Sequence, residues 1–279
     1  LHLKRLLVGG YRRVFEIGRV FRNEGLSPRH NPEFTMLEAY EAYGDYGSMR
    51  ELTEAIIVDA ARAAGAPSAA EPEADPSGGN PLRRTYGGRP LDLTPPFRTA
   101  RMVDLVAERC DFDPLRAWDE GALAAQARRL GLELRPGLGP GAILLEIYER
   151  AVEGTLFDPT FVLDYPAEVS PLARRRRDDG RFVERFELIV AGRELANAFS
   201  ELNDPVDQRQ RFEEQRERRA AGDEEALRFD EDFLIAIETG MPPAGGLGLG
   251  IDRLVMLLTD SAAIRDVLLF PTMRPQPGR

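Results

Sequence analysis

Hydrophobic and polar residues alternate with a period of two in several stretches of the chain, a pattern typical of strands. The stretches RRVFEIGRVF and EFTMLEAYEAY flank the turn RNEGLSPRHNP, and we expect them to pair as an antiparallel hairpin. TFVLDYP and RFELIVAGRELANAFSEL also have strand character, and GGLGLGIDRLVMLLTD has the pattern of a glycine-rich strand that enters a helix. The pattern therefore predicts a hairpin, further strands and a strand-to-helix unit.

Helical spacing of apolar residues follows the predicted hairpin. In SMRELTEAIIVDAARAAG, Ser48 is the expected N-cap, because Glu51 stands three residues on. Between residues 99 and 158, TARMVDLVAERC, WDEGALAAQARRLG and GAILLEIYERAVEG predict three helices separated by Pro and Gly. We interpret them as a helical insertion against the main sheet. The stretch DPVDQRQRFEEQRERRAAG predicts a charged, solvated helix.

The segment 66–88, APSAAEPEADPSGGNPLRRTYGG, is rich in Pro, Gly, Ala and acidic residues. A segment of this composition buries too little apolar surface to form a core. We therefore expect an exposed, flexible excursion that carries no function.

Composition and charge exclude several classes of protein. The 279 residues contain no apolar run near the roughly 18 that a membrane span requires, so we exclude an integral membrane protein. One cysteine, Cys110, and two histidines, His2 and His30, supply neither an internal disulfide nor a Cys/His metal cluster, and they fit a reducing, cytoplasmic location. Because the net charge is −10, any contact with nucleic acid must be local.

The turn of the predicted hairpin collects basic side chains. Arg22 ends the first strand and Arg29 and His30 lie across the turn, so three donors can converge on one polyanion such as a triphosphate. Phe34 offers a flat face on which a base can stack. The alternative is a hairpin with solvated charges and a core phenylalanine.

Two glutamates in FELIVAGRELANAFSEL suggest a cation site. Glu187 lies on a strand and Glu194 follows the AGR break, so a hairpin can bring the two carboxylates together. Mg2+ usually bridges protein carboxylates and substrate phosphates. Paired surface glutamates without a ligand are the alternative.

Period-two alternation places several polar and aromatic side chains on shared strand faces. The two sets are Phe34, Met36, Glu38 and Tyr40 on one strand, and Asn197, Phe199 and Glu201 on another. If the two sets face each other, their carboxylates, amide and phenol form what a buried ammonium group requires. The acidity of such a pocket favours a cationic substrate.

The glycine-rich string GGLGLGIDRL does not fit a dinucleotide-binding fingerprint, and it does not end in Gly-Lys-Ser/Thr. We therefore reject the Rossmann and P-loop readings. The glycines can let a flat ligand approach a strand backbone, with Arg253 at the strand-to-helix junction lying over a ring or meeting a phosphate. A tightly packed strand is the alternative.

These stretches resemble a known family. FRNEGLSPRHNPEFTMLEAY is similar to motif 2, and GLGLGIDRLVMLLT to motif 3, of the class II aminoacyl-tRNA synthetases. Within that family, LKRLLVGG, DYPAEVSPLARR, ERFELIVAGRELANAFSELNDP and IRDVLLFPTMRP resemble the lysyl-tRNA synthetases. The resemblance implies an α+β fold, an antiparallel sheet flanked by helices with a helical insertion. It implies that residues 1–279 form the catalytic domain without motif 1 and without the anticodon-binding domain.

The resemblance also implies roles for the residues of an ATP site. Arg22 would be catalytic and hold the α-phosphate, and Glu24 would meet the adenine amino group. Arg29 and His30 would face the outer phosphates. Phe34 and Arg253, the second of which would also be catalytic, would sandwich the adenine ring.

For the other ligands, the resemblance assigns Glu187 and Glu194 to Mg2+. The lysine-binding residues it implies are Glu38, Tyr40, Asn197, Phe199 and Glu201, with Glu201 and Tyr40 placed to hold the side-chain ammonium. The family has an acidic residue that binds the lysine α-amino group just before the position of LHLKRLL, and His2 stands where it usually has tyrosine.

The implied activity is that of a lysine-tRNA ligase. Lysine and ATP would give lysyl-adenylate, and lysine would then pass to the 3′ end of tRNA(Lys), in a cytoplasmic enzyme whose full-length parent is a homodimer. One alternative is a paralogue that forms the same adenylate but modifies a protein or a lipid. Another is a non-catalytic module that binds nucleotide, amino acid or a partner. Specificity for aspartate or asparagine is disfavoured, because acidic pocket residues repel an anionic substrate.

Overall fold

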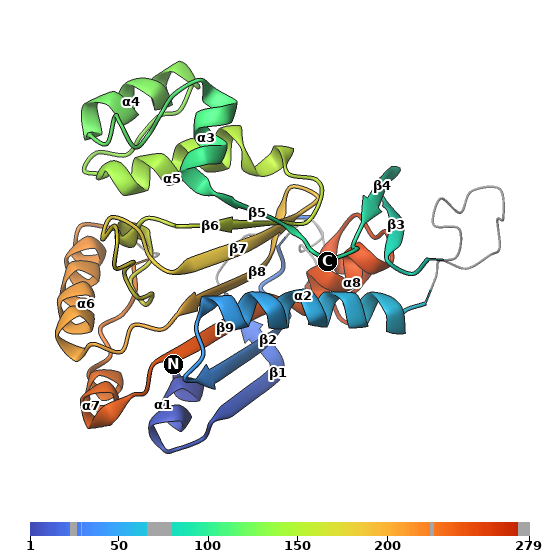
Figure 1. Ribbon diagram of the computed structural model, residues 1–279, viewed down its shortest axis with the longest axis horizontal. Helices are drawn as coiled ribbons and strands as arrows, with labels where there is room; N and C mark the ends of the chain where they lie inside the picture. Colours follow the sequence, from blue (N-terminus) through green and yellow to red (C-terminus); the bar gives the residue numbers. More distant parts are fainter. Residues whose placement is uncertain (23–26, 29, 66–79, 224–225, 273–279) are drawn as a thin grey trace, which may run out of the picture.

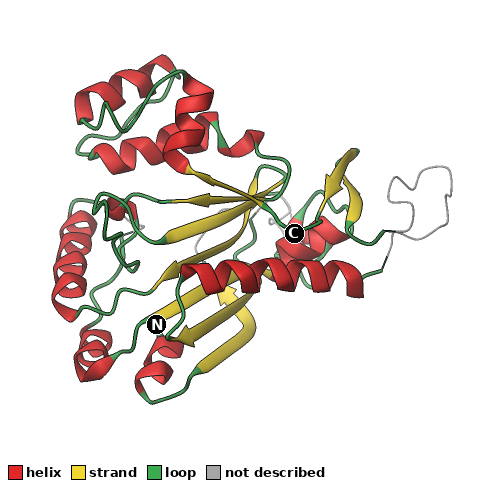
Figure 2. Ribbon diagram, viewed as in Figure 1, coloured by secondary structure: helices red, strands yellow, loops and turns green. Residues whose placement is uncertain are grey.

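The computed structural model describes residues 1–22, 27–28, 30–65, 80–223 and 226–272. Its elements in chain order are α1 (His2–Val8), β1 (Arg13–Phe21), β2 (Glu33–Ala42), α2 (Tyr46–Ala63), β3 (Arg83–Tyr86), β4 (Arg89–Asp92), β5 (Arg98–Arg101), α3 (Met102–Cys110), α4 (Glu120–Arg129), α5 (Pro140–Ala151), η1 (Glu153–Thr155), β6 (Thr160–Leu163), η2 (Ala167–Val169), β7 (Arg185–Val190), β8 (Arg193–Ser200), α6 (Pro205–Ala220), α7 (Glu231–Gly240), β9 (Ala244–Gly250), α8 (Ile251–Leu258) and η3 (Ile264–Asp266). Helices surround a central sheet (Figure 2), which confirms the α+β fold class.

Seven strands form the central sheet in the order β1-β2-β9-β8-β7-β6-β5 (Figure 1). Every neighbouring pair is antiparallel except β5 and β6, which are parallel. The expected hairpin is present, because β1 pairs with β2 from Arg13 opposite Glu41 to Phe21 opposite Glu33. Although β9 is the last strand in the sequence, it lies between β2 and β8. It therefore links the N-terminal hairpin to the rest of the sheet.

One face of the sheet is apolar and covered by α2 and α8. Leucines of β9, alanines of β8 and helix residues such as Ile57 and Leu254 form one core there. Because successive side chains of a strand point to opposite faces, the intervening positions of the same strands point away from this core. Those positions carry the polar residues of the candidate site.

The three helices predicted between residues 99 and 158 are α3, α4 and α5, and they build a second core at the β5/β6 end of the sheet (Figure 1). The first residues of that range do not belong with the helices. Residues 98–101 form β5, which pairs in parallel with 160–163 and extends the sheet. The expected start of the insertion is therefore wrong, about three residues too early, because the segment before Met102 forms backbone hydrogen bonds with β6 instead of joining the helix.

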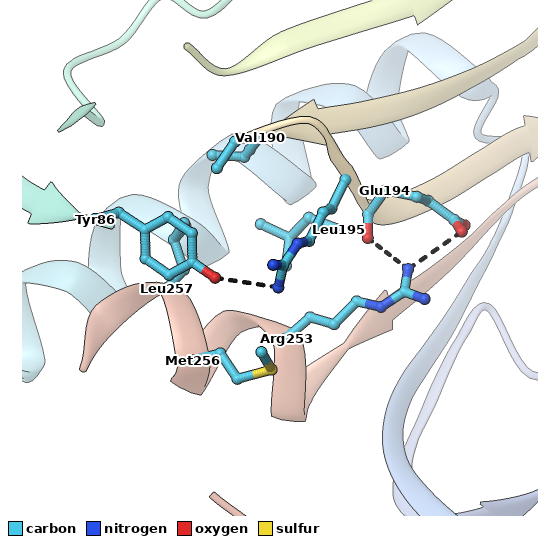
Figure 3. Close-up of a pocket in the computed structure, with 9 residues that line it drawn as sticks. Tyr86, Val190, Glu194, Leu195, Arg253, Met256 and Leu257 are labelled. Carbon is cyan, nitrogen blue, oxygen red and sulfur yellow. Dashed lines mark hydrogen bonds and ion pairs between the residues drawn. The ribbon is translucent and has the colours of Figure 1, made fainter. Parts of the chain in front are cut away.

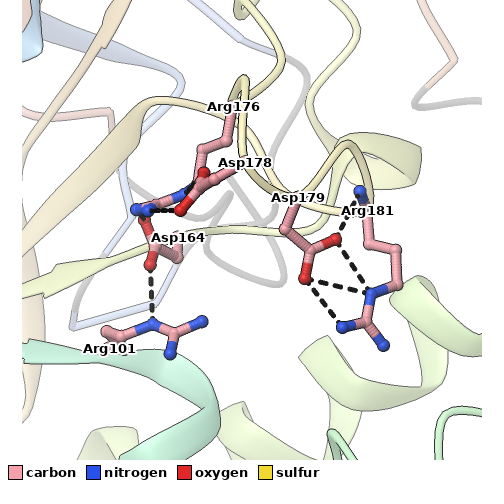
Figure 4. A network of polar contacts seen from close by, with 6 residues as sticks. All are labelled: Arg101, Asp164, Arg176, Asp178, Asp179 and Arg181. Carbon is pink, nitrogen blue, oxygen red and sulfur yellow. Dashed lines mark hydrogen bonds and ion pairs between the residues drawn. The ribbon is translucent and has the colours of Figure 1, made fainter.

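Asp164 ties this end of the sheet together (Figure 4). Its side chain is 1% exposed, and it accepts hydrogen bonds from Arg101 Nε at 2.8 Å and from Arg176 at 2.6 Å. A buried carboxylate is stable only when it is paired and hydrogen-bonded. Arg176 also binds Asp178 at 2.6 Å, so the network links β5 to the loop that precedes β7.

Two further expectations need correction. The N-cap of α2 is Asp45, not Ser48, because the Asp45 side chain accepts from the backbone N–H of Gly47 and Ser48 while Ser48 Oγ accepts from the Asp45 N–H. Ser48 is therefore the reciprocal partner of a capping box. Helix α6 is not solvated all round, because one face is buried and includes Arg211 and Phe212.

The expected excursion at 66–88 is wrong at its end. Residues 66–79 lie outside the described part of the chain, but 83–86 form β3, and Arg84 and Tyr86 are buried. Arg84 donates to the carbonyl oxygens of Pro81, Ala61, Gly65 and Leu258 at 2.7–3.1 Å. The guanidinium thus anchors this hairpin to the ends of α2 and α8.

Helix α1 was not predicted from the sequence. It packs through Leu7 into a third core that α6 and α7 supply with Phe212, Phe233 and Leu234. Within the part of the chain that the structure describes, no helix combines the length and apolar character that spanning a membrane would take.

Candidate functional site

A cavity of about 960 Å3 lies on the sheet face opposite α2. Every predicted site residue that falls within the described ranges lines it: Arg22, His30, Phe34, Glu38, Tyr40, Glu187, Glu194, Asn197, Phe199, Glu201 and Arg253. Glu24 and Arg29 lie outside the described residues. Residues separated by more than 200 positions in the sequence therefore meet in one cavity.

Strand register explains how these residues meet. Residues paired across neighbouring strands lie side by side on the same face of the sheet. One row across four strands is Glu38, Gly248, Asn197 and Glu187, and the next row is Tyr40, Gly246, Phe199 and Arg185. The two glycines of β9 leave the middle of each row without a side chain of its own, and neighbouring side chains fill the space: Glu201 and Tyr40 lie over Gly246, and Met36 lies over Gly248.

Glu194 reaches the same cavity because of a β-bulge. Glu194 and Asn197 are three positions apart and would point to opposite faces in a regular strand. The pairing of β7 with β8 shifts between Leu188 and Ile189, so that Glu194 pairs with Ile189 while Ala196 pairs with Leu188. A bulge of this kind re-aims a side chain, and here both Glu194 and Asn197 line the cavity.

Arg253 enters the cavity from the first turn of α8. Its guanidinium donates to the backbone oxygen of Glu194 at 2.6 Å and lies 3.4 Å from Glu194 Oε2 (Figure 3). The Arg253 side chain is 31% exposed, so part of it faces the cavity. Arg193, the residue before Glu194 in β8, donates to the hydroxyl of Tyr86 at 3.2 Å and so helps to fix the start of the strand that carries Glu194.

The basic and aromatic residues of the hairpin form another wall. The guanidinium carbon of Arg22 lies 5.3 Å from the centroid of the Phe34 ring. One donor of Arg22 also lies 3.9 Å from the sulfur of Met36. His30 forms a turn with Ser27, whose hydroxyl lies 3.1 Å from His30 Nδ1. These contacts gather a guanidinium, an imidazole and a flat ring at one end of the cavity.

Carboxylates and a phenol gather at the other end. The hydroxyl of Tyr40 donates to Glu38 Oε2 at 3.1 Å. Burial, with the charges of Glu201 and Glu38, raises the pKa of Tyr40 far above its usual range, so the phenol remains a donor. Burial raises the pKa of Glu201, and the ammonium of Lys4 acts in the opposite direction. Lys4 forms a buried ion pair with Glu201.

Arg185 is a cavity residue that our sequence reasoning did not identify. It donates to Asn197 Oδ1 at 3.0 Å, to Glu187 Oε1 at 2.6 Å and to Ser170 Oγ at 2.9 Å. Burial and the carboxylate of Glu194 raise the pKa of Glu187 to about 7, although Arg185 opposes the shift. The period-two alternation that places Glu187 on this face also places Arg185 there, so the signal was present in the sequence.

Two other residues were missed: Asp252, which lines the cavity, and Lys4, which pairs with the cavity residue Glu201. Asp252 is 8% exposed and accepts the backbone N–H of Thr35 at 2.6 Å, which fixes α8 to β2. Lys4 precedes its partner Glu201 by almost 200 residues. Nothing in the local pattern around Lys4 indicates that contact.

Glu187 and Glu194 fit a magnesium ion. Glu194 raises the pKa of Glu187, and a cation between the two carboxylates would relieve that repulsion. Among the described residues, no three or more His, Cys, Asp or Glu side chains gather into a complete metal site. Mg2+ commonly uses only one or two carboxylates and takes its other ligands from substrate phosphates and water. The donor set therefore suits an ion that arrives with a phosphate substrate.

The chain is similar to known proteins along nearly its whole length. Residues 1–274 match the family described as tRNA synthetases class II (D, K and N). The chain is 55% identical over 278 residues to a lysine-tRNA ligase of Moorella thermoacetica, covering 99% of this chain and 54% of that protein. It is 55% identical over 279 residues to a lysine-tRNA ligase of a Synechococcus species, covering 99% of this chain and 52% of that protein. The chain spans about half the length of the curated relatives it matches.

Proposed function

Because the chain belongs to the family of tRNA synthetases class II (D, K and N), we propose that it carries the lysine-activating site of a lysine-tRNA ligase. The observation that carries the proposal is that Glu38, Tyr40 and Glu201 gather at one end of the cavity, whereas Arg22 lies at the end lined by the hairpin turn. This arrangement suits a ligand with an ammonium at one end and a carboxylate that must meet ATP at the other. The similarity to lysine-tRNA ligases over 99% of the chain supports the same assignment.

The proposed reaction has two steps. First, a carboxylate oxygen of lysine attacks the α-phosphorus of ATP, a new oxygen-phosphorus bond forms, and pyrophosphate leaves with the electrons of the broken bond. Second, the terminal ribose hydroxyl of tRNA(Lys) attacks the carbonyl carbon of the adenylate, the bond from that carbon to the phosphate oxygen breaks, and AMP leaves with the electrons of that bond while its phosphate takes up the hydroxyl proton. Neither step needs a nucleophile from the protein, because positioning and fixed charge supply the stabilisation.

The residues of the cavity divide this work. Arg22 stabilises negative charge on the α-phosphate, and Phe34 and Arg253 hold the adenine ring. His30 faces the outer phosphates. The predicted roles of Glu24 at the adenine amino group and of Arg29 at the phosphates complete the set. Each of these residues acts by orientation and charge, and none transfers a proton in this scheme.

Lysine would lie with its ammonium toward Glu201 and Tyr40, while Glu38, Asn197 and Phe199 border its aliphatic part and its backbone groups. Among the three amino acids of this family, aspartate, lysine and asparagine, carboxylates at this end of the cavity favour lysine. They would repel the negative side chain of aspartate, and the neutral side chain of asparagine would leave the carboxylates without a cationic partner. Glu187 and Glu194 would hold Mg2+. When bound, that ion supplies positive charge to the phosphates.

Further parts of the proposal concern the acceptor, the assembly and the location. We propose tRNA(Lys) as the acceptor, a homodimer as the assembly and the cytoplasm as the location. The single cysteine is consistent with a reducing compartment. The first two rest on the family resemblance.

The test is lysine-dependent exchange of radioactive pyrophosphate into ATP by the purified 279-residue chain. We expect exchange with lysine and little or none with arginine, ornithine or aspartate. The chain with Arg22→Ala is the blank, because it should bind lysine but lose exchange. Exchange that is equally fast with ornithine and lysine, or that persists in the blank, would contradict the assignment.

A further inference from the structure

Lys4 is the most buried basic side chain in the cavity region. It is 3% exposed, and its ammonium forms an ion pair with Glu201 Oε2. The same ammonium lies 5.1 Å from the ring centroid of Phe199 and 5.8 Å from that of Tyr40. Phe233 of α7 completes the surroundings at 5.9 Å. Three aromatic faces and a carboxylate therefore enclose one cation of the chain itself.

Glu201 presents two different oxygens. It is 1% exposed, and a carboxylate this deeply buried is unstable unless it is paired. Lys4 forms an ion pair with Oε2, and neither oxygen has a hydrogen-bond partner among the described residues. Glu201 also lines the cavity. An ionised carboxylate accepts about four hydrogen bonds, so the contact with Lys4 leaves capacity for a second cationic donor.

We propose that Lys4 is a positioning residue of the lysine pocket, which holds one oxygen of Glu201 and leaves the other for the side-chain ammonium of the substrate. The inference rests on the function proposed above. It adds that Glu201, the carboxylate that binds the substrate ammonium, is held by Lys4 of α1, almost 200 residues earlier in the sequence.

The charge of the pocket follows from this arrangement. Lys4 compensates the charge of Glu201, and Glu38 supplies a second carboxylate at the same end of the cavity for a substrate ammonium. A second consequence concerns geometry. Glu201 cannot turn away from the cavity when the substrate is absent, because Lys4 holds it, and a preorganised anion binds a cation more strongly than one that must first be ordered.

The experiment measures the KM for lysine, the kcat of pyrophosphate exchange and the Kd for ATP in four forms of the chain. These are the unmodified chain, Lys4→Met, Lys4→Arg and the control Arg5→Met. Arg5 lies next to Lys4 on α1 and pairs with Asp230 at 3.2 Å, so its replacement disturbs the same helix without touching Glu201.

We expect Lys4→Met to raise the KM for lysine about 10- to 100-fold, the loss typical of removing a charged partner from a buried group. The kcat should change by less than about fivefold, because the phosphate end of the cavity is intact. Lys4→Arg keeps the charge but not the shape of the ammonium, so it should raise the KM about three- to tenfold. Arg5→Met should leave the KM for lysine unchanged, and the Kd for ATP should be the same in all four forms.

A lower kcat with an unchanged KM in the Lys4 variants would mean that Lys4 only supports folding, and it would overturn the inference. A lower KM in Lys4→Met would overturn it too, because Lys4 would then compete with the substrate for Glu201. If Lys4→Met does not fold, the KM of Lys4→Arg decides by the same criterion. Absence of lysine-dependent exchange in the folded, unmodified chain would instead overturn the proposed function, and the inference with it.

Discussion

Gly246 controls the space in which Glu201 and Tyr40 lie, and its replacement by alanine should damage lysine binding. Gly246 pairs with Tyr40 of β2 on one side and with Phe199 of β8 on the other. A Cβ at this position would lie 1.9 Å from Glu201 Oε1 and 2.8 Å from Tyr40 Cε1. Both atoms belong to groups that we assign to the substrate ammonium.

The size of the effect follows from these distances. Bringing the Glu201 oxygen to even 3.0 Å requires a shift of about 1.1 Å from the 1.9 Å contact. Glu201 is 1% exposed and paired with Lys4, so it has little room in which to move. A misplacement of about 1 Å at a reacting or binding group can cost about 100-fold, and overpacking of a core typically costs about 1–3 kcal/mol of stability.

We therefore expect Gly246→Ala to raise the KM for lysine by about 10- to 100-fold, with a Kd for ATP close to that of the unmodified chain. The measurement is pyrophosphate exchange at varied lysine, with ATP binding followed by calorimetry. Gly250→Ala in the same strand is the matched control, because its Cβ would meet nothing nearer than 3.6 Å. Equal KM values for lysine in the two variants would refute the reasoning, since the steric clash is the only difference that it invokes.

Two further predictions concern stability. Glu187 has a pKa of about 7 in the folded chain and 4.5 as its ordinary value, so between these values the native state keeps a proton that the unfolded state releases. The free energy of unfolding should then fall by up to about 3 kcal/mol as the pH rises through this window. Urea titrations without Mg2+ measure this fall, which Glu187→Gln should remove. Identical pH profiles of the unfolding free energy in the unmodified chain and in Glu187→Gln would contradict the assigned pKa. Arg84→Met should lower the free energy of unfolding by about 2–4 kcal/mol, because buried carbonyl oxygens lose their donor. Replacement of the exposed neighbour, Arg83→Met, is the control. Equal urea midpoints for the two variants would refute the anchoring role of Arg84.

The sequence predicted what depends on near neighbours along the chain. Alternation along β2 placed Glu38 and Tyr40 on one face, and the turn between two alternating segments indicated the hairpin. It did not predict that β9 lies between β2 and β8, because strand order depends on contacts between distant segments. The glycines of β9 were interpreted as room for a flat ligand. At Gly246, the structure shows that the room is already used by the side chains of Glu201 and Tyr40.

The candidate carboxylates were also predicted without their partners. Arg185, Arg253 and Lys4 hold Glu187, Glu194 and Glu201, respectively. Arg185 and Glu187 are two residues apart in the sequence. Arg253 lies in α8 and Lys4 in α1, each far in the sequence from the carboxylate that it binds. Local patterns therefore indicate where negative charge gathers, whereas the cations that stabilise it are brought in by the fold.

These three pairs explain how an acidic cavity can exist before its ligands bind. Several carboxylates on one face would repel each other, and burial would protonate them, as the raised pKa of Glu187 indicates. A resident arginine or lysine beside each carboxylate offsets part of its charge and holds it in place, yet it leaves part of the acceptor capacity unused. An incoming ammonium or Mg2+ then binds oxygens that are already ordered. The resident cations therefore act on binding through the carboxylates, which is why replacing Lys4 should change the affinity for lysine rather than the rate of the chemical step.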